Sequence, residues 1–152
     1  MKNNMKNSMN QRFIRIAVLW FAAGIMLGIY MGISHQHIDK QVHVHGLLLG
    51  WVSCALFALV HTAWPRLQTL RSAAVHFWLH NLGLVMLLTG LVIERREATM
   101  AGPFLGIGSI TLAVATVIFT WNVWRVTTMQ NNDDLTMKEV SGKLHHAHFD
   151  LS

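Results

Sequence analysis

VHGLLLGWVSCALFALVHTAW, residues 44–64, is a run of 21 residues that contains no Asp, Glu, Lys or Arg. At a rise of about 1.5 Å per residue, a helix of this length spans the hydrocarbon core of a bilayer, which is about 30 Å thick. Backbone polar groups inside lipid must be hydrogen-bonded within the protein, so such a run crosses as a helix and not as a strand. We therefore expect residues 44–64 to form a transmembrane helix.

Three further apolar runs of similar length flank this one, at residues 13–33, 73–93 and 104–126. Only 12% of the chain is charged, whereas soluble domains average about 25% and use those charges to cover a water-facing surface. The sequence therefore predicts an all-α integral membrane four-helix bundle over residues 13–126.

Polar segments lie outside and between the runs. Residues 1–12 predict a polar N-terminal arm, and residues 127–152 predict a mobile polar tail. Residues 94–102 predict a loop, which puts Pro103 in the first turn of the last helix, where its missing N–H is tolerated. A basic start followed by an apolar run also fits a cleaved signal peptide. We expect the first run to be retained, because it is longer than a typical signal and lacks a small-residue cleavage site.

Basic residues gather near both ends of the chain and between the second and third runs. They are Lys2, Lys6, Arg12, Arg15, Arg66, Arg71, Arg125, Lys138 and Lys143. Because cytoplasmic segments of membrane proteins carry the excess of Lys and Arg, we expect both termini and residues 65–72 in the cytoplasm. The sequence thus predicts a multi-pass protein of a bacterial inner (plasma) membrane. Topology accounts for the net charge of +5, so no nucleic-acid partner is needed.

Ten histidines stand in this apolar chain, and an ionisable side chain inside a span is costly unless it is paired or ligated. His43 and His45 open the second helix at its outer end. At about 100° per residue they project to nearly opposite flanks, which predicts contacts with two different ligands. Gly46 and Gly50 follow and are expected to leave room for a flat macrocycle. The alternative is that both histidines are interfacial and wetted by the outer loop.

A second group of histidines is predicted near the inner end of the bundle. His76 and His80 are four residues apart and share one face of the third helix. His61 lies at similar depth near the inner end of the second helix. Their imidazoles predict a three-nitrogen site for copper, zinc or iron. The alternative is that they join helices, with His80 and Asn81 hydrogen-bonding across the bundle.

The residues missing from the spans argue against several classes of function. No span contains a carboxylate, which argues against a proton pump that works through buried Asp or Glu. No nucleophile–base pair, phosphate loop or cysteine metal motif is visible, so the chain carries no hydrolase or transferase signature. The single cysteine, Cys54, permits no intramolecular disulfide. Redox chemistry remains as the class of reaction that the histidines favour.

Three pieces of sequence together resemble a known family. HVHGLLLGWVS at residues 43–53, the pair Pro65–Arg66 and HFWLHNLG at residues 76–83 resemble small relatives of haem-copper oxidase subunit I. That family includes cytochrome c oxidases, quinol oxidases and nitric oxide reductases, and the resemblance covers roughly residues 14–126. The His-x-His is similar to the oxidase helix that carries one ligand for each of two haems. The resemblance implies haem b held by His43 and His45, with copper as a second candidate cofactor.

The resemblance also implies an oligomer. Subunit I of the large oxidases has twelve helices in three arcs of four, whereas this chain has four apolar runs. It therefore implies a homotrimer that rebuilds the twelve-helix ring as a closed cyclic assembly. His43 of one copy and His45 of the next would then share one haem at each interface.

The same resemblance bears on function. Three identical chains cannot differentiate the haems and copper of an oxidase, so it favours electron transfer, with a redox protein or a quinol as partner. Chemistry of a diatomic gas, O2 or NO, is the other expectation for such a haem. A copper-binding or assembly factor is the alternative from another class. An accessory subunit of a respiratory complex, with histidines that only join helices, is a further one.

Overall fold

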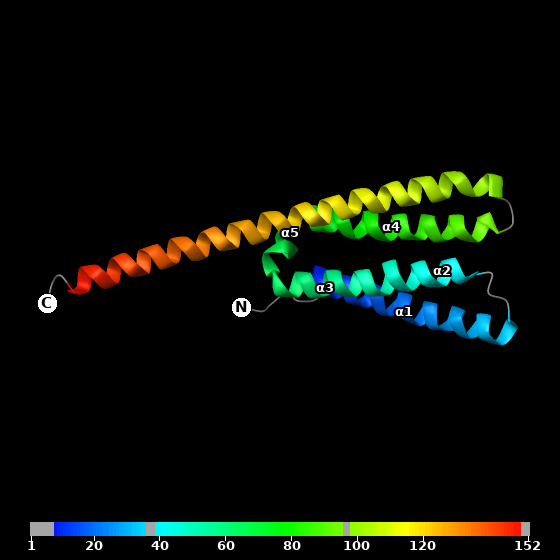
Figure 1. Ribbon diagram of the computed structural model, residues 1–152, viewed down its shortest axis with the longest axis horizontal. Coiled ribbons are helices and arrows are strands. Elements are labelled where there is room, and N and C mark those ends of the chain that lie inside the picture. Colours follow the sequence, from blue (N-terminus) through cyan, green and yellow to red (C-terminus); the bar gives the residue numbers. More distant parts are fainter. Residues whose placement is uncertain (1–7, 36–38, 96–97, 150–152) are drawn as a thin grey trace.

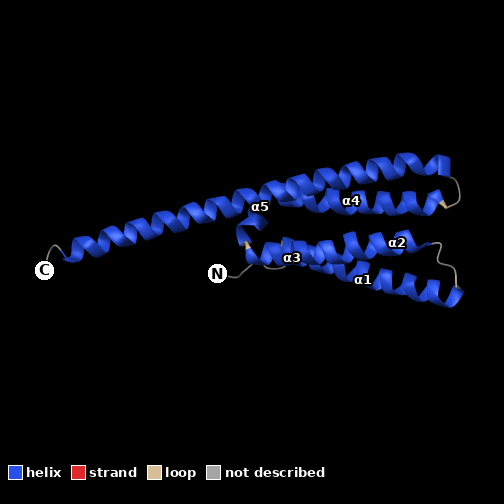
Figure 2. Cartoon of the chain, in the orientation of Figure 1, coloured by secondary structure: helices blue, strands red, loops and turns tan. Residues whose placement is uncertain are grey.

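Helices make up nearly the whole chain (Figure 2). The computed structural model describes residues 8–35, 39–95 and 98–149, apart from the side chains of residues 98, 134 and 142–149. Over these ranges the fold is all-helical, and four helices are long and apolar enough to cross a membrane. The predicted all-α membrane fold with four spans is confirmed at this level.

Four spans and one short connecting helix make up the fold. In chain order they are α1 (Met9–Ser34), α2 (Lys40–His45), the π-helix η3 (Gly46–Val52), α3 (Ser53–Ala63), the 3-10 helix η4 (Pro65–Thr69), α4 (Arg71–Glu94) and α5 (Ala98–Phe149). The second span is formed by α2, η3 and α3, which follow one another without a break. It is therefore one helix with a π-helical middle.

The spans pair into two hairpins that lie side by side (Figure 1). α1 packs along the second span, and α4 packs along α5. The start of α1, the end of α3 and the start of α4 lie at one end, which we call the inner end after the predicted orientation. The ends of α1 and α4 and the starts of α2 and α5 lie at the opposite end, which we call the outer end. α5 continues past the inner end as a single helix.

Glycines bring α4 and α5 close together. A Cβ added to Gly108 would lie 2.6 Å from the backbone nitrogen of Leu87, and one added to Gly83 would lie 3.1 Å from the Gly108 carbonyl oxygen. Both separations are shorter than ordinary van der Waals contact, so a side chain at Gly108 would force the helices apart and one at Gly83 would need its neighbours to shift by a few tenths of an ångström. Membrane helices associate through such close packing, because lipid provides no hydrophobic force between them.

Contacts at three depths join the two hairpins. At the outer end Asp39 forms an ion pair with Arg95. Near the middle the His80 ring of α4 hydrogen-bonds to the Leu49 carbonyl of η3. At the inner end a cluster of aromatic rings spans both hairpins. The relative placement of the hairpins, and of the histidines they carry, is therefore set along the whole bundle.

The first two spans begin about one turn earlier than predicted. α1 starts at Met9 inside the predicted arm, and the second span starts at Lys40. The first N–H groups of a helix lack partners within it, so an extra turn moves them beyond the apolar run, where water reaches them. The early turn of α1 is also tied to α3, because Asn10 donates to the Thr62 hydroxyl at 3.2 Å.

The last helix differs from the prediction at both ends. It begins at Ala98, so Pro103 is its sixth residue and not in its first turn. Alanine and methionine before the proline favour helix, and one hydrogen bond is lost there. After residue 126, where the sequence predicts a mobile tail, α5 continues to Phe149. Extending an existing helix is easy, since each added residue gains one hydrogen bond, and no proline interrupts this segment.

Candidate functional site

His43 lies at the outer end of the second span, against a glycine-lined face of α1. Its Nδ1 is 3.0 Å from the Gly24 carbonyl oxygen, and because a carbonyl only accepts, Nδ1 carries the proton. A helical side chain covers the turn before it, so Gly28 leaves the Gly24 carbonyl open to the ring. A Cβ at Gly28 would lie 3.0 Å from the ring Cε1. His43 Nε2 has no hydrogen-bond partner among the described residues, and in the neutral ring it keeps a lone pair.

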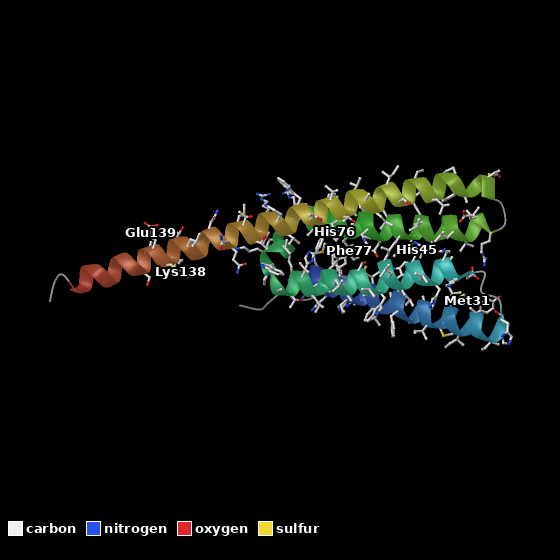
Figure 3. The ribbon with its side chains drawn as sticks, in the orientation of Figure 1. Met31, His45, His76, Phe77, Lys138 and Glu139 are labelled. Atoms are coloured by element: carbon white, nitrogen blue, oxygen red, sulfur yellow. The ribbon has the colours of Figure 1, made fainter. Side chains whose placement is uncertain are left out.

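The His45 ring also carries its proton on Nδ1, but its surroundings differ from those of His43. Its Nδ1 donates to the Gln41 carbonyl of its own helix at 2.9 Å, and the side chain is half-buried near the outer end (Figure 3). Nε2 again has no partner within the described ranges. His43 faces α1 whereas His45 bonds only within α2, as the two-residue spacing predicts. The chain thus presents two imidazoles with Nδ1 anchored and Nε2 open.

The π-helix η3 leaves one carbonyl without its usual donor. In an α-helix the Ser53 N–H would bond to the carbonyl of Leu49, four residues back, but here it bonds to Leu48. His80 Nε2 of α4 donates to the Leu49 oxygen at 3.0 Å. Cys54 Sγ lies 3.9 Å from the same oxygen. His80, which is 3% exposed, therefore uses its Nε2 within the protein.

Gly46 and Gly50 lie inside η3, and both are buried. The prediction of open space beside them does not hold at Gly50, because the indole of Trp20 packs directly on it. Gly46 has ordinary contact with Leu88, whose Cδ1 would be 4.0 Å from an added Cβ. Close helix packing uses the space that the missing side chains leave. A macrocycle bound by His43 and His45 would therefore not lie on Gly50 of this chain.

An aromatic cluster surrounds the inner histidines, of which His76 is labelled in Figure 3. His76 is fully buried, with the ring centroids of Phe13, Phe57 and Phe119 at 5.3, 4.6 and 5.0 Å. Neither of its ring nitrogens has a hydrogen-bond partner among the described residues. His61, also buried, donates Nδ1–H to the Phe57 carbonyl at 2.8 Å and leaves Nε2 unpaired. A buried polar atom without a partner costs about 1–3 kcal/mol.

The predicted three-nitrogen metal site is not formed. In the part of the chain that the structure describes, no group of three His, Cys, Asp or Glu side chains has the arrangement that a metal ion needs. The His80 ring centroid is 5.9 Å from that of His76, but η3 uses the His80 Nε2. His61 and His76 remain as a pair with open nitrogens. The predicted link across helices holds for His80, whereas Asn81 donates to a carbonyl of its own helix at 2.7 Å.

An ion pair at the outer end was not predicted from the sequence. Asp39 directly precedes the helix that carries His43 and His45, without a side-chain capping bond to it, and pairs with Arg95 at the end of α4. Both side chains are largely buried, at 13% and 22% exposed. The sequence does carry opposite charges in the two outer loops, Asp39 in the first and Arg95 in the second. The prediction of membrane orientation only counts charges in each loop, so it does not pair these two residues. The pair fixes the start of the helix that bears the outer histidines.

These features define an all-helical multi-pass membrane protein with imidazoles at two depths of its bundle. No protein-family model, no curated protein and no solved structure matches this chain. The function is therefore argued from the arrangement of the histidines.

Proposed function

We propose that this chain is a haem b protein of a bacterial inner membrane, related to haem-copper oxidase subunit I, with both termini in the cytoplasm. The observation that carries the proposal is the state of His43 and His45. Each ring anchors Nδ1–H on a backbone carbonyl and leaves Nε2 without a partner among the described residues. Metal-ligating histidines have this arrangement, because the second hydrogen bond fixes the tautomer and the ring orientation.

The donor set fits haem iron. Neutral imidazole nitrogen is a common axial ligand of haem, and ligation of both axial positions favours electron transfer. A single imidazole leaves the second axial position for O2 or NO. His43 and His45 would hold the iron, and the iron would supply one-electron redox chemistry. A redox protein or a quinol would exchange electrons with it.

A homotrimer is part of the proposal. His43 faces α1 and His45 bonds within α2, so the two rings of one chain have different surroundings. Because the two rings of one chain point in different directions, one iron would be bound by His43 of one copy and His45 of the next copy. A head-to-tail interface of this kind closes into a ring when its rotation is one third of a turn.

A reduced-minus-oxidised absorption spectrum of the purified protein, with iron counted per chain, tests the proposal. His43→Ala and His45→Ala are expected to lose the haem or convert it to a high-spin form. His35→Asn is the matched control, because His35 is an exposed outer histidine in the left-handed conformation that asparagine tolerates. A protein without a Soret band from cells supplied with haem would refute the assignment.

A second candidate, copper binding or delivery, is favoured by the inner pair. The open ring nitrogens of His61 and His76 are buried in the aromatic cluster, and imidazole is a good ligand for copper. Copper without porphyrin in the purified protein would support this function. A role as an accessory subunit is supported by the His80 link between hairpins. Retention of all cofactors after each histidine is replaced in turn would favour that role.

A further inference from the structure

The π-helix η3 separates the outer histidines from the rest of the second span. α2 carries His43 and His45 before it, and α3 carries the buried face with Ala58 and His61 after it. A π-helical turn holds one more residue than an α-helical turn, because its hydrogen bonds run from residue i to i−5. One residue corresponds to about 100° of rotation. Loss of the extra residue would therefore turn α2 by about this angle relative to α3.

The direction of His43 depends on this register. Its Nδ1 reaches the Gly24 carbonyl because α2 is turned so that position 43 faces α1. Leu47, in the π-helix, faces α1 as well, and its Cγ lies 2.7 Å from the place of a Cβ on Gly24. A rotation of about 100° would carry both side chains off this face.

A π-helix is less stable than an α-helix of the same sequence and needs support. The support here comes from α4. The Leu49 carbonyl, which loses Ser53 as its donor, is a partly buried acceptor to which His80 donates at 3.0 Å. If η3 returned to regular α-helix, the Leu49 carbonyl would turn along the helix axis toward the Ser53 N–H, and the change of register would move its oxygen away from His80. The bond therefore favours the π-helical register over the α-helical one.

We propose that His80 is a positioning residue for the outer histidines: by donating to the Leu49 carbonyl it holds the π-helical register that aims His43 at α1. The part that concerns haem rests on the proposed function. The part that concerns helix register does not. His80 acts through η3 and is not an iron ligand.

The first test measures register without any cofactor. Gly24→Cys and Leu47→Cys are combined, since the contact between these positions brings two cysteines within disulfide reach, a Cβ separation of about 3.5–4.5 Å. Cys54 is buried and stays in place. With an oxidant the pair is expected to cross-link when His80 is present. His80→Leu removes the donor and is expected to lower the equilibrium constant for the π-helical register about tenfold, the shift that loss of one such bond produces, and therefore to slow cross-linking.

His80→Gln keeps an amide N–H at nearly the same reach and is expected to restore the cross-link. Asn81→Leu is the matched control, because Asn81 is the adjacent polar residue and donates only within its own helix. It is expected to cross-link like the unaltered pair. Circular dichroism and gel filtration of each variant show whether it is folded. Equal cross-linking in folded His80→Leu would overturn the proposal.

The second test follows haem in the same variants without the added cysteines. His80→Leu is expected to lose the low-spin spectrum or to shift the reduction potential, and His80→Gln is expected to recover both. If His80→Gln restores the cross-link but not the spectrum, the register role stands, and the statement that His80 is not an iron ligand is refuted. It is also possible to separate the two claims. If neither the unaltered chain nor any variant binds haem, but cross-linking still depends on residue 80, then the role of His80 in helix register stands and only the haem assignment fails.

Discussion

Replacing Gly108 by alanine tests the close packing of α4 on α5. The new Cβ would lie 2.6 Å from the Leu87 nitrogen and 3.0 Å from the Gly83 carbonyl oxygen. Both are backbone atoms of α4, so the helices must separate by nearly 1 Å to restore ordinary contact. Overpacking of this kind costs about 1–3 kcal/mol. Alanine regains about 0.5–1 kcal/mol of helix propensity over glycine, which leaves a net loss of up to about 2.5 kcal/mol.

Gly106→Ala is the matched control. Gly106 lies two residues away in α5, and a Cβ there would have no neighbour within 4 Å. Gly106→Ala gains the higher helix propensity of alanine without any overpacking. The free energies of unfolding of the two variants are therefore expected to differ by about 1–3 kcal/mol. Unfolding in detergent, followed by tryptophan fluorescence, measures the difference as a shift in midpoint. Equal midpoints for the two variants would show that α4 and α5 do not approach as described.

Three more outcomes follow from the structure. Gly28→Ala places a Cβ against the His43 ring and is expected to lower haem affinity about fivefold. Gly32→Ala is the control, because its Cβ meets nothing within 4 Å, and it is expected to leave haem affinity unchanged. Spectral titration with haem measures both affinities. Asp39→Asn leaves the buried Arg95 without its ion pair and is expected to cost about 1.5–3 kcal/mol in unfolding experiments; an unchanged midpoint would contradict the pairing. His76→Leu removes two unpaired buried nitrogens and is expected to raise the unfolding midpoint, unless a bound ion uses them.

The amino-acid sequence predicted the histidine positions better than their roles. Helical spacing predicts that His76 and His80 share one face of the third helix, with His61 at similar depth, and the structure buries all three. Their assignment to one metal ion does not follow, because it assumes that all three rings turn toward a common point. His80 turns instead to a carbonyl that only the π-helix makes available. Periodicity does not identify this π-helix, because residues 44–64 are apolar on nearly every side and a shift of one residue leaves no visible break in their pattern.

The glycines show the same difference between composition and contact. Because Gly46 and Gly50 have no side chains, the sequence predicts that a neighbouring group can lie close to this part of the helix, and a neighbouring group does. What fills the space depends on a residue far away in the chain, Trp20, which a reading of the second span alone does not include. The bulk of an indole and the missing side chain of a glycine match only once α1 and the second span are paired.

The sequence by itself determined that four segments of this chain are membrane-spanning helices in length and composition, because that property belongs to each run of about 20 residues separately. Tertiary structure alone decided which nitrogens of His43 and His80 are used, whereas His45 and His61 bond to carbonyls four residues back in their own helices. The deciding carbonyls lie 19 residues from His43 and 31 from His80. A hydrogen bond over that separation exists only after the helices have packed, so it leaves no mark on local sequence pattern.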